Sequence, residues 1–264
     1  MTTTTAAPLS RLTSVGIVRS EWIKLRTLRS TVWSFAIVIV ISIAFSLLFA
    51  SVVSSDMGQV IGADGAQFVV VVVTAGISFS QLVVAVLGAL VITGEYSTGM
   101  IRSTFAAVPH RIPALLGKAL VLFVTTFVVG LISTFGPYFI VTPILASKGM
   151  ESSIGDPDVF LPLIGGAFYL ACVAIFSLAI GAILRNSAGG IAVALGAILV
   201  LPILVSIIPA DWATTLGQYL FSNAGTGFYS PGLEFDFWQN LAIVAGWLVV
   251  LFAGASVLLK RRDA

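Results

Sequence analysis

The sequence predicts an all-α integral membrane protein with six transmembrane helices. Of its 264 residues, 58% are hydrophobic and only 9% are charged, whereas a soluble domain carries roughly 25% charged residues. The hydrophobic residues form continuous runs of about 20 residues or more, which is the length that a membrane-spanning helix needs, and they lack the alternation of a membrane β-barrel. The six runs cover residues 32–53, 68–93, 114–146, 159–184, 189–208 and 237–259.

The residues before the first run predict a helix lying at the membrane surface. Residues 1–10 form a Thr/Ala-rich tail that we expect to be disordered, without a cleavable signal peptide, and residues 11–31 have helical periodicity. The apolar stripe of this amphipathic interfacial helix consists of Leu12, Val15, Val18, Trp22 and Leu25, and its basic side of Arg19, Lys24 and Arg26. Such a helix is a simple topological anchor or also touches a partner protein, and the sequence leaves both readings open.

A polar segment at residues 94–113 separates the second and third runs. Ile101, Phe105 and Val108 recur at helical spacing within it, so a short helix with one apolar face is expected, ended by the prolines at 109 and 113. Glu95 lies at its start and has two plain structural roles: it caps the next helix or pairs with Arg102.

Three further features concern packing. The residues Gly136, Pro137 and Pro202 predict bends in the third and fifth runs. The amide of Gln81 lies inside the second run, where a hydrogen bond between helices is favoured over a contact with substrate. Residues 209–236 contain an apolar piece at 212–221 that is too short to cross the membrane, so it dips into the outer leaflet or caps the bundle.

The basic residues predict the orientation. Twelve of the thirteen Lys and Arg residues fall on one side of this six-helix topology, and Lys148 is the exception. Because cytoplasmic loops carry the excess of Lys and Arg, we expect both termini, the 94–113 segment and the basic tail at 260–264 to face the cytoplasm of a multi-pass plasma-membrane protein.

Several function classes receive no support from the sequence. It contains no G-x-x-x-x-G-K-[ST] phosphate loop, and one cysteine, Cys172, with one histidine, His110, makes no metal constellation. We therefore expect a chain that is not an enzyme and carries no cofactor or metal of its own. Ionisable residues are missing from the middle of the runs, which argues against an ion-coupled carrier, and the net charge of +2 reflects topology rather than nucleic-acid binding.

Four segments give the chain a resemblance to the membrane-spanning permease subunits of ABC-2 type ATP-driven exporters, especially the small stand-alone permeases of actinobacteria. The resemblance covers essentially the whole chain as a single transmembrane domain, residues 1–264. The segments are residues 20–27 (SEWIKLRT), 94–104 (GEYSTGMIRST), 108–111 (VPHR) leading to Lys118, and 222–225 (SNAG).

This resemblance implies a type V exporter architecture in which the 94–113 segment is the coupling helix, docked on a separate ATPase subunit that binds ATP and Mg²⁺. The implied coupling residues are Glu95, Tyr96, Gly99, Ile101, Arg102 and Phe105, and those of the interfacial helix are Glu21, Trp22, Lys24 and Arg26. Implied pathway candidates are Phe79, Gln81, Leu82 and Leu204. A second permease copy, identical or paralogous, would complete the pathway.

The expected function is export of a hydrophobic or amphipathic drug, lipid or peptide. Two rivals stay open, namely a non-transport membrane anchor or sensor and an ion-driven carrier. The sequence names no particular substrate.

Overall fold

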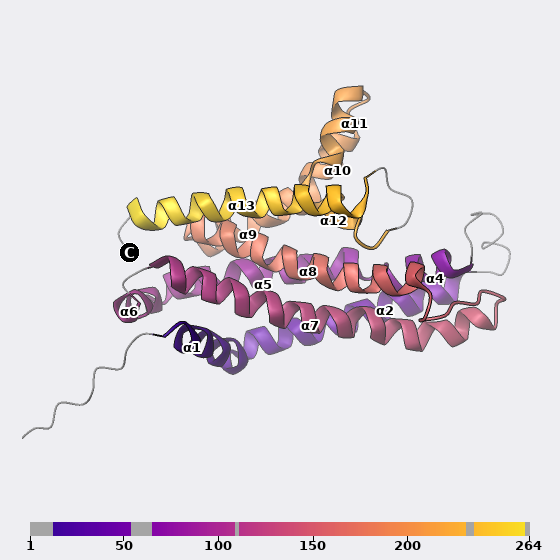
Figure 1. Ribbon diagram of the computed structural model, residues 1–264, viewed down its shortest axis with the longest axis horizontal. Coiled ribbons are helices and arrows are strands. Elements are labelled where there is room, and N and C mark those ends of the chain that lie inside the picture. The colour runs from indigo at the N-terminus through magenta and orange to yellow at the C-terminus, as the bar shows by residue number, and fades with distance from the viewer. Residues whose placement is uncertain (1–12, 54–64, 109–110, 231–234, 262–264) are drawn as a thin grey trace, which may run out of the picture.

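The computed structural model describes residues 13–53, 65–108, 111–230 and 235–261, which form an all-α protein without strands in these ranges (Figure 1). Six of its helical segments are long and apolar enough to cross a membrane, so the prediction of six spans is confirmed at that level. The expected tail at 1–10 and most of the 260–264 segment lie outside the described residues.

The helices follow one another in the predicted order. Helix α1 (Ser14–Thr27) precedes span one, α2 (Arg29–Val52); span two comprises α4 (Gly65–Thr74) and α5 (Ile77–Ser97); and α6 (Met100–Ala107) leads to span three, α7 (Arg111–Ala146). Span four is α8 (Pro157–Leu184), and span five comprises α9 (Ser187–Leu195), the π-helical turn η1 (Gly196–Val200) and α10 (Leu201–Ser206). Short helices α11 (Asp211–Gln218) and α12 (Phe221–Thr226) precede span six, α13 (Phe237–Arg261).

Two boundaries differ from the expectation. The predicted interfacial helix ends early, because Leu28 is extended with φ −76° and ψ 112° and α2 begins at Arg29. The predicted polar segment begins late, because α5 continues through Gly94 and Glu95 to Ser97. Glu95 and Tyr96 therefore belong to the last turn of span two.

Span four is the centre of the bundle. Helix α8 packs against α5, α7 and α13, and 78% of its most apolar window is buried, against 11% for span six. A helix that is apolar all round is suited to such a central place. Helices α1 and α6 and the end of α13 gather at one end of the bundle, which we call the basic end (Figure 1).

Span two is interrupted at Ala75 and Gly76, and a serine side chain of span one satisfies a carbonyl at the break. Ser46 Oγ donates to the carbonyl of Val73 at 2.9 Å, and Ser80 Oγ, which lies 2.9 Å from Ser42 Oγ, donates to the carbonyl of Val38. In a membrane no water is present to do this. A side chain on Gly76 would meet the backbone of Ser42 at 2.5 Å, so the close approach requires glycine.

Span five deviates from α-helical geometry next to Pro202. The proline has no N–H group and its ring crowds the carbonyl four residues earlier, and the π turn Gly196–Val200 widens the helix at that place. The sequence predicted a bend at Pro202, and the structure has a π turn just before the proline.

The segment between spans five and six re-enters the bundle. Phe221 is 2% exposed and stacks on Phe176 of α8 with ring centroids 4.0 Å apart. The indole N–H of Trp247, ten residues into α13, donates to the carbonyl of Tyr219 at 2.9 Å. Within 212–221, Trp212, Leu216 and Tyr219 are 46–60% exposed, and the segment packs into the bundle at its end through Phe221. That it dips into the outer leaflet or caps the bundle stays a prediction.

Close packing of α5 on α8 generates a stability prediction. A Cβ atom at Gly88 would lie 2.2 Å from the carbonyl oxygen of Ala174, so Gly88→Ala forces the two central helices apart, at a cost of about 1–3 kcal/mol for an overpacked core. We expect a lower midpoint of thermal unfolding in detergent. Gly246→Ala in α13, where the Cβ atom meets nothing within 4 Å, is the matched control and should not lower the midpoint. Equal midpoints for the two variants would contradict the packing shown by the structure.

Candidate functional site

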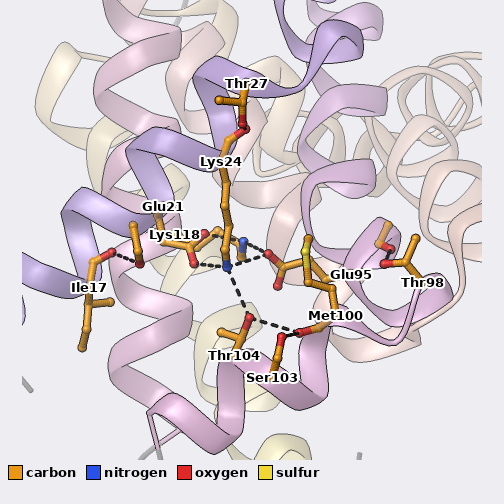
Figure 2. Close-up of polar contacts among 12 residues, drawn as sticks. Ile17, Glu21, Lys24, Thr27, Glu95, Thr98, Met100, Ser103, Thr104 and Lys118 are labelled. Atoms are coloured by element: carbon orange, nitrogen blue, oxygen red, sulfur yellow. Dashed lines mark hydrogen bonds and ion pairs between the residues drawn. The ribbon is translucent and has the colours of Figure 1, made fainter.

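Four charged side chains meet where α1, α5 and α7 converge at the basic end; we call Glu21, Lys24, Glu95 and Lys118 the ion cluster (Figure 2). Lys118 Nζ lies 2.5 Å from Glu21 Oε2 and 2.8 Å from Glu95 Oε1. Lys24 Nζ lies 2.6 Å from Glu21 Oε1 and 3.0 Å from Glu95 Oε1. Each lysine thus bridges both carboxylates.

The ion cluster is largely withdrawn from solvent and has no formal net charge. The side chains of Glu21, Glu95 and Lys118 are 3%, 4% and 5% exposed, and that of Lys24 is 26% exposed. Charges buried to this degree persist only when they are paired and hydrogen-bonded. The two lysines therefore compensate the two glutamates, and no single member is dispensable.

The ion cluster also reaches the short helix α6. Lys24 Nζ donates a hydrogen bond to Thr104 Oγ1 of α6 at 3.2 Å, as Figure 2 shows. One lysine of α1 is therefore bonded to the end of span two and to the helix that follows it. Burial alone lowers the pKa of Lys24, but its hydrogen bonds and charge interactions with Glu21 and then Glu95 outweigh that effect and raise the pKa above its ordinary value. Lys24 stays charged at neutral pH.

Helix α1 buries part of its apolar stripe together with one carboxylate. Its buried residues are Glu21 and Leu25, whereas Val15 is 76% and Trp22 is 47% exposed. Ile17 packs on α7 at Gly117, where a Cβ atom would lie 2.8 Å from the isoleucine methyl group. Val15 and Trp22 of the apolar stripe thus face away from the protein, whereas Val18 and Leu25 pack on its core. Lys24, placed on the basic side from sequence, lies in the ion cluster.

Glu95 takes neither of the two roles first considered for it. Its Oε1 accepts from Lys24 and Lys118, its Oε2 is buried without a partner in the described chain, and Arg102 is exposed. The N-cap of α6 is Gly99 with a left-handed φ of 73°, and no side chain caps that helix. Pairing with Arg102 was wrong because α6 turns away from α5 at Gly99.

Helix α6 has an inner and an outer face. Ile101 is 4% exposed and lines the same small cavity as Ile92, Leu115 and Leu259, so it anchors α6 to the bundle. Met100, Arg102, Ser103 and Ala106 are exposed. Phe105 belongs to α6 but its side chain lies outside the described part, as do Pro109 and His110.

Arginine side chains hold the end of span six against the same region. Arg111 Nη1 donates to the carbonyl of Leu259 at 2.8 Å, and Arg185 Nη2 donates to that of Leu258 at 3.3 Å. The last carbonyls of a helix have no partners within it, and these arginines supply them. Arg185 also lies 5.3 Å from the ring centre of Tyr96, a cation–π distance.

The remaining candidates are dispersed. Trp22 and Arg26 are exposed on α1. Phe79 stacks on Phe45 with centroids 3.8 Å apart, and Gln81 Oε1 accepts from Tyr169 O–H of α8 at 2.5 Å, which is the helix–helix bond favoured from sequence. Leu82 is half-buried and Leu204 is 56% exposed on α10.

Sequence reasoning missed two members of this site. Lys118 was noted only as a basic residue at the foot of span three, and Thr104 was not selected. The available signal was a lysine within an apolar helix. It lies 23 residues after the glutamate near the end of the preceding span.

Because the four charges of the ion cluster balance one another, we expect the removal of one of them to lower the stability of the fold. Lys118→Met leaves the buried carboxylates with a single lysine, and breaking a buried ion pair costs about 3–5 kcal/mol, so the midpoint of thermal unfolding in detergent should fall markedly. Adding Glu95→Gln should restore part of the loss, because it removes the excess charge. Arg102→Met, an exposed change at the same end, should stay within about 0.5 kcal/mol of the parent. An unchanged midpoint for Lys118→Met would refute the role of the ion cluster.

Comparisons leave the family unassigned. No protein-family model matches this chain, and no curated protein matches it. The function is therefore argued from the site itself.

Proposed function

We propose that this chain is the permease subunit of an ATP-driven exporter of the ABC-2 type, coupled to a separate ATPase subunit through α6. The observation that carries the proposal is the bonding of α6 and α1 to spans two and three by one buried ion cluster. This observation agrees with the resemblance noted in residues 20–27 and 94–104. Those two segments supply three of the four charges of the ion cluster, and also Thr104.

The geometry supports a coupling role for α6. Its outer face exposes Arg102 and Ser103 to a partner, while Ile101 and the Lys24–Thr104 bond hold its inner face. A push on α6 is therefore transmitted to α1, α5 and α7 together rather than absorbed by a loose loop. Packed elements of this kind switch between discrete arrangements instead of deforming continuously.

The proposal places the basic end in the cytoplasm of a plasma-membrane protein, since Lys and Arg are concentrated there. ATP and Mg²⁺ belong to the partner subunit. A second permease copy would lie beside the laterally exposed spans, since only 22% and 11% of the windows of spans five and six are buried within one chain. An apolar lateral surface suits a hydrophobic or amphipathic drug, lipid or peptide.

Photo-crosslinking tests the partner. A photoreactive phenylalanine at position 102 should capture, in native membranes, a protein whose sequence contains the G-x-x-x-x-G-K-[ST] loop of an ATPase. The same probe at Thr215 on α11, at the far end from α6, is the control and should not capture it. The proposal is wrong if only proteins without that loop are captured, or if both positions capture equally. Either result would favour an anchor or sensor.

Charge reversal tests coupling. Arg102→Glu should abolish ATPase association and the ATP-dependent transport measured in vesicles, without lowering the unfolding midpoint, because Arg102 is exposed. Lys260→Glu reverses another exposed charge at the same end, on α13, and should leave both intact. Transport that continues without ATP would instead identify an ion-driven carrier.

Cysteine labelling tests orientation. The native Cys172 is 1% exposed, so it should not react with the reagent, and any labelling comes from the added cysteine. A membrane-impermeant maleimide added to intact cells should label Ser147→Cys, which follows span three, but label Ala188→Cys, which begins span five, only after lysis. The reverse pattern would place the basic end outside.

A further inference from the structure

A cavity lies beside the re-entrant segment, remote from the ion cluster. It has a volume of about 560 Å³ and is bounded by the end of span five, α11, α12 and the start of α13. That volume lies within the range of small-molecule sites, roughly 300–1,000 Å³. Its polar lining consists of Ser206, Thr214, Gln218, Asn223, Thr226 and Asn240.

These side chains are partly engaged within the protein. The amide nitrogens of Asn223 and Asn240 each donate one hydrogen, to the carbonyls of Gly217 and Phe235. The hydroxyls of Ser206, Thr214 and Thr226 donate to carbonyls within their own helical turns. The hydroxyl oxygens keep their lone pairs, and each of the two amides keeps its oxygen and a second N–H.

Among its described lining residues the cavity has no charged side chain. Because the lining is polar but uncharged, it offers neither a phosphate or carboxylate nor a cation a counter-charge. It fits an uncharged group with several O–H donors. Asn240 is 2% exposed, so its amide lies deep in the lining rather than at the surface.

The surroundings of the cavity are apolar and aromatic. Phe235 lines it and packs on Tyr219 with ring centroids 5.4 Å apart, giving a surface for the C–H face of a sugar ring. Leu204, Ile207, Trp212 and Leu216 are 46–70% exposed on α10 and α11. An acyl chain can lie along these side chains while its headgroup enters the cavity.

We propose that this cavity binds the neutral, hydroxyl-rich headgroup of a glycolipid-like amphiphile. The site is formed by elements outside the coupling region, so its test does not depend on whether an ATPase partner exists.

Lipid retention measured by native mass spectrometry tests the site. The full chain is placed in phosphatidylcholine nanodiscs containing equal fractions of monogalactosyl diacylglycerol and phosphatidylglycerol with the same acyl chains. The galactolipid should be retained at least fivefold over either phospholipid. Saturating methyl β-galactoside in solution should not displace it, and full displacement would overturn the proposal, since the site would then take a free sugar.

Two matched pairs of variants locate the site. Gly217→Leu fills the cavity, since a Cβ atom there meets its neighbours only at 3.7–3.8 Å, and it should abolish the preference; Thr215→Leu, on the same helix but outside the lining, should retain it. Thr214→Val should weaken retention about fivefold through loss of one hydrogen bond, whereas Thr215→Val should not, although both hydroxyls donate to the Asp211 carbonyl. Preference for phosphatidylglycerol, no preference, or full retention in Gly217→Leu would overturn the assignment.

Discussion

The pairing of two buried glutamates with two buried lysines is the interaction on which the arrangement of the basic end depends. Opposite charges about 4 Å apart attract by roughly 4 kcal/mol where the effective dielectric constant is near 20, but withdrawing them from water costs several kcal/mol per ion. The balance favours the folded state only when all four contacts form together. Glu21 and Lys118 are 97 residues apart in sequence, so the ion cluster fixes the register of α1 against α7, and through Thr104 it also sets the position of α6.

The spans were predictable because the membrane imposes both length and apolarity on them. The packing partners of each span were not predictable, because hydropathy does not show which helices are neighbours. Glu95 illustrates the difference. Its place at the foot of span two follows from sequence, but its bonds to Lys24 and Lys118 depend on how α1 and α7 pack, whereas Arg102, the nearer basic residue in sequence, is directed outward. The break at Ala75 and Gly76 likewise depends on the neighbouring span, whose Ser46 satisfies the Val73 carbonyl.

Helix α1 shows how an amphipathic helix can bury charged groups at the end of a membrane bundle. In a soluble protein an apolar stripe packs inward, because water lies on the other side. At the end of a membrane bundle the apolar side has lipid available to it, and the polar side can be covered by protein if its charges are paired. Trp22 is exposed and Glu21 is buried for this reason. The same argument gives Ile101 of α6 a structural role as an anchor, which leaves the exposed polar residues for recognition.

The re-entrant segment has a consequence for the order of events during synthesis. Residues 209–230 emerge from the ribosome before span six, yet the carbonyl of Tyr219 accepts from Trp247, and Phe176 of α8 contacts both Phe221 and that later indole. The segment therefore completes its contacts only after α13 has been made and packed. A chain stopped before α13 would leave the Tyr219 carbonyl without its indole donor and Phe176 without one of its aromatic neighbours.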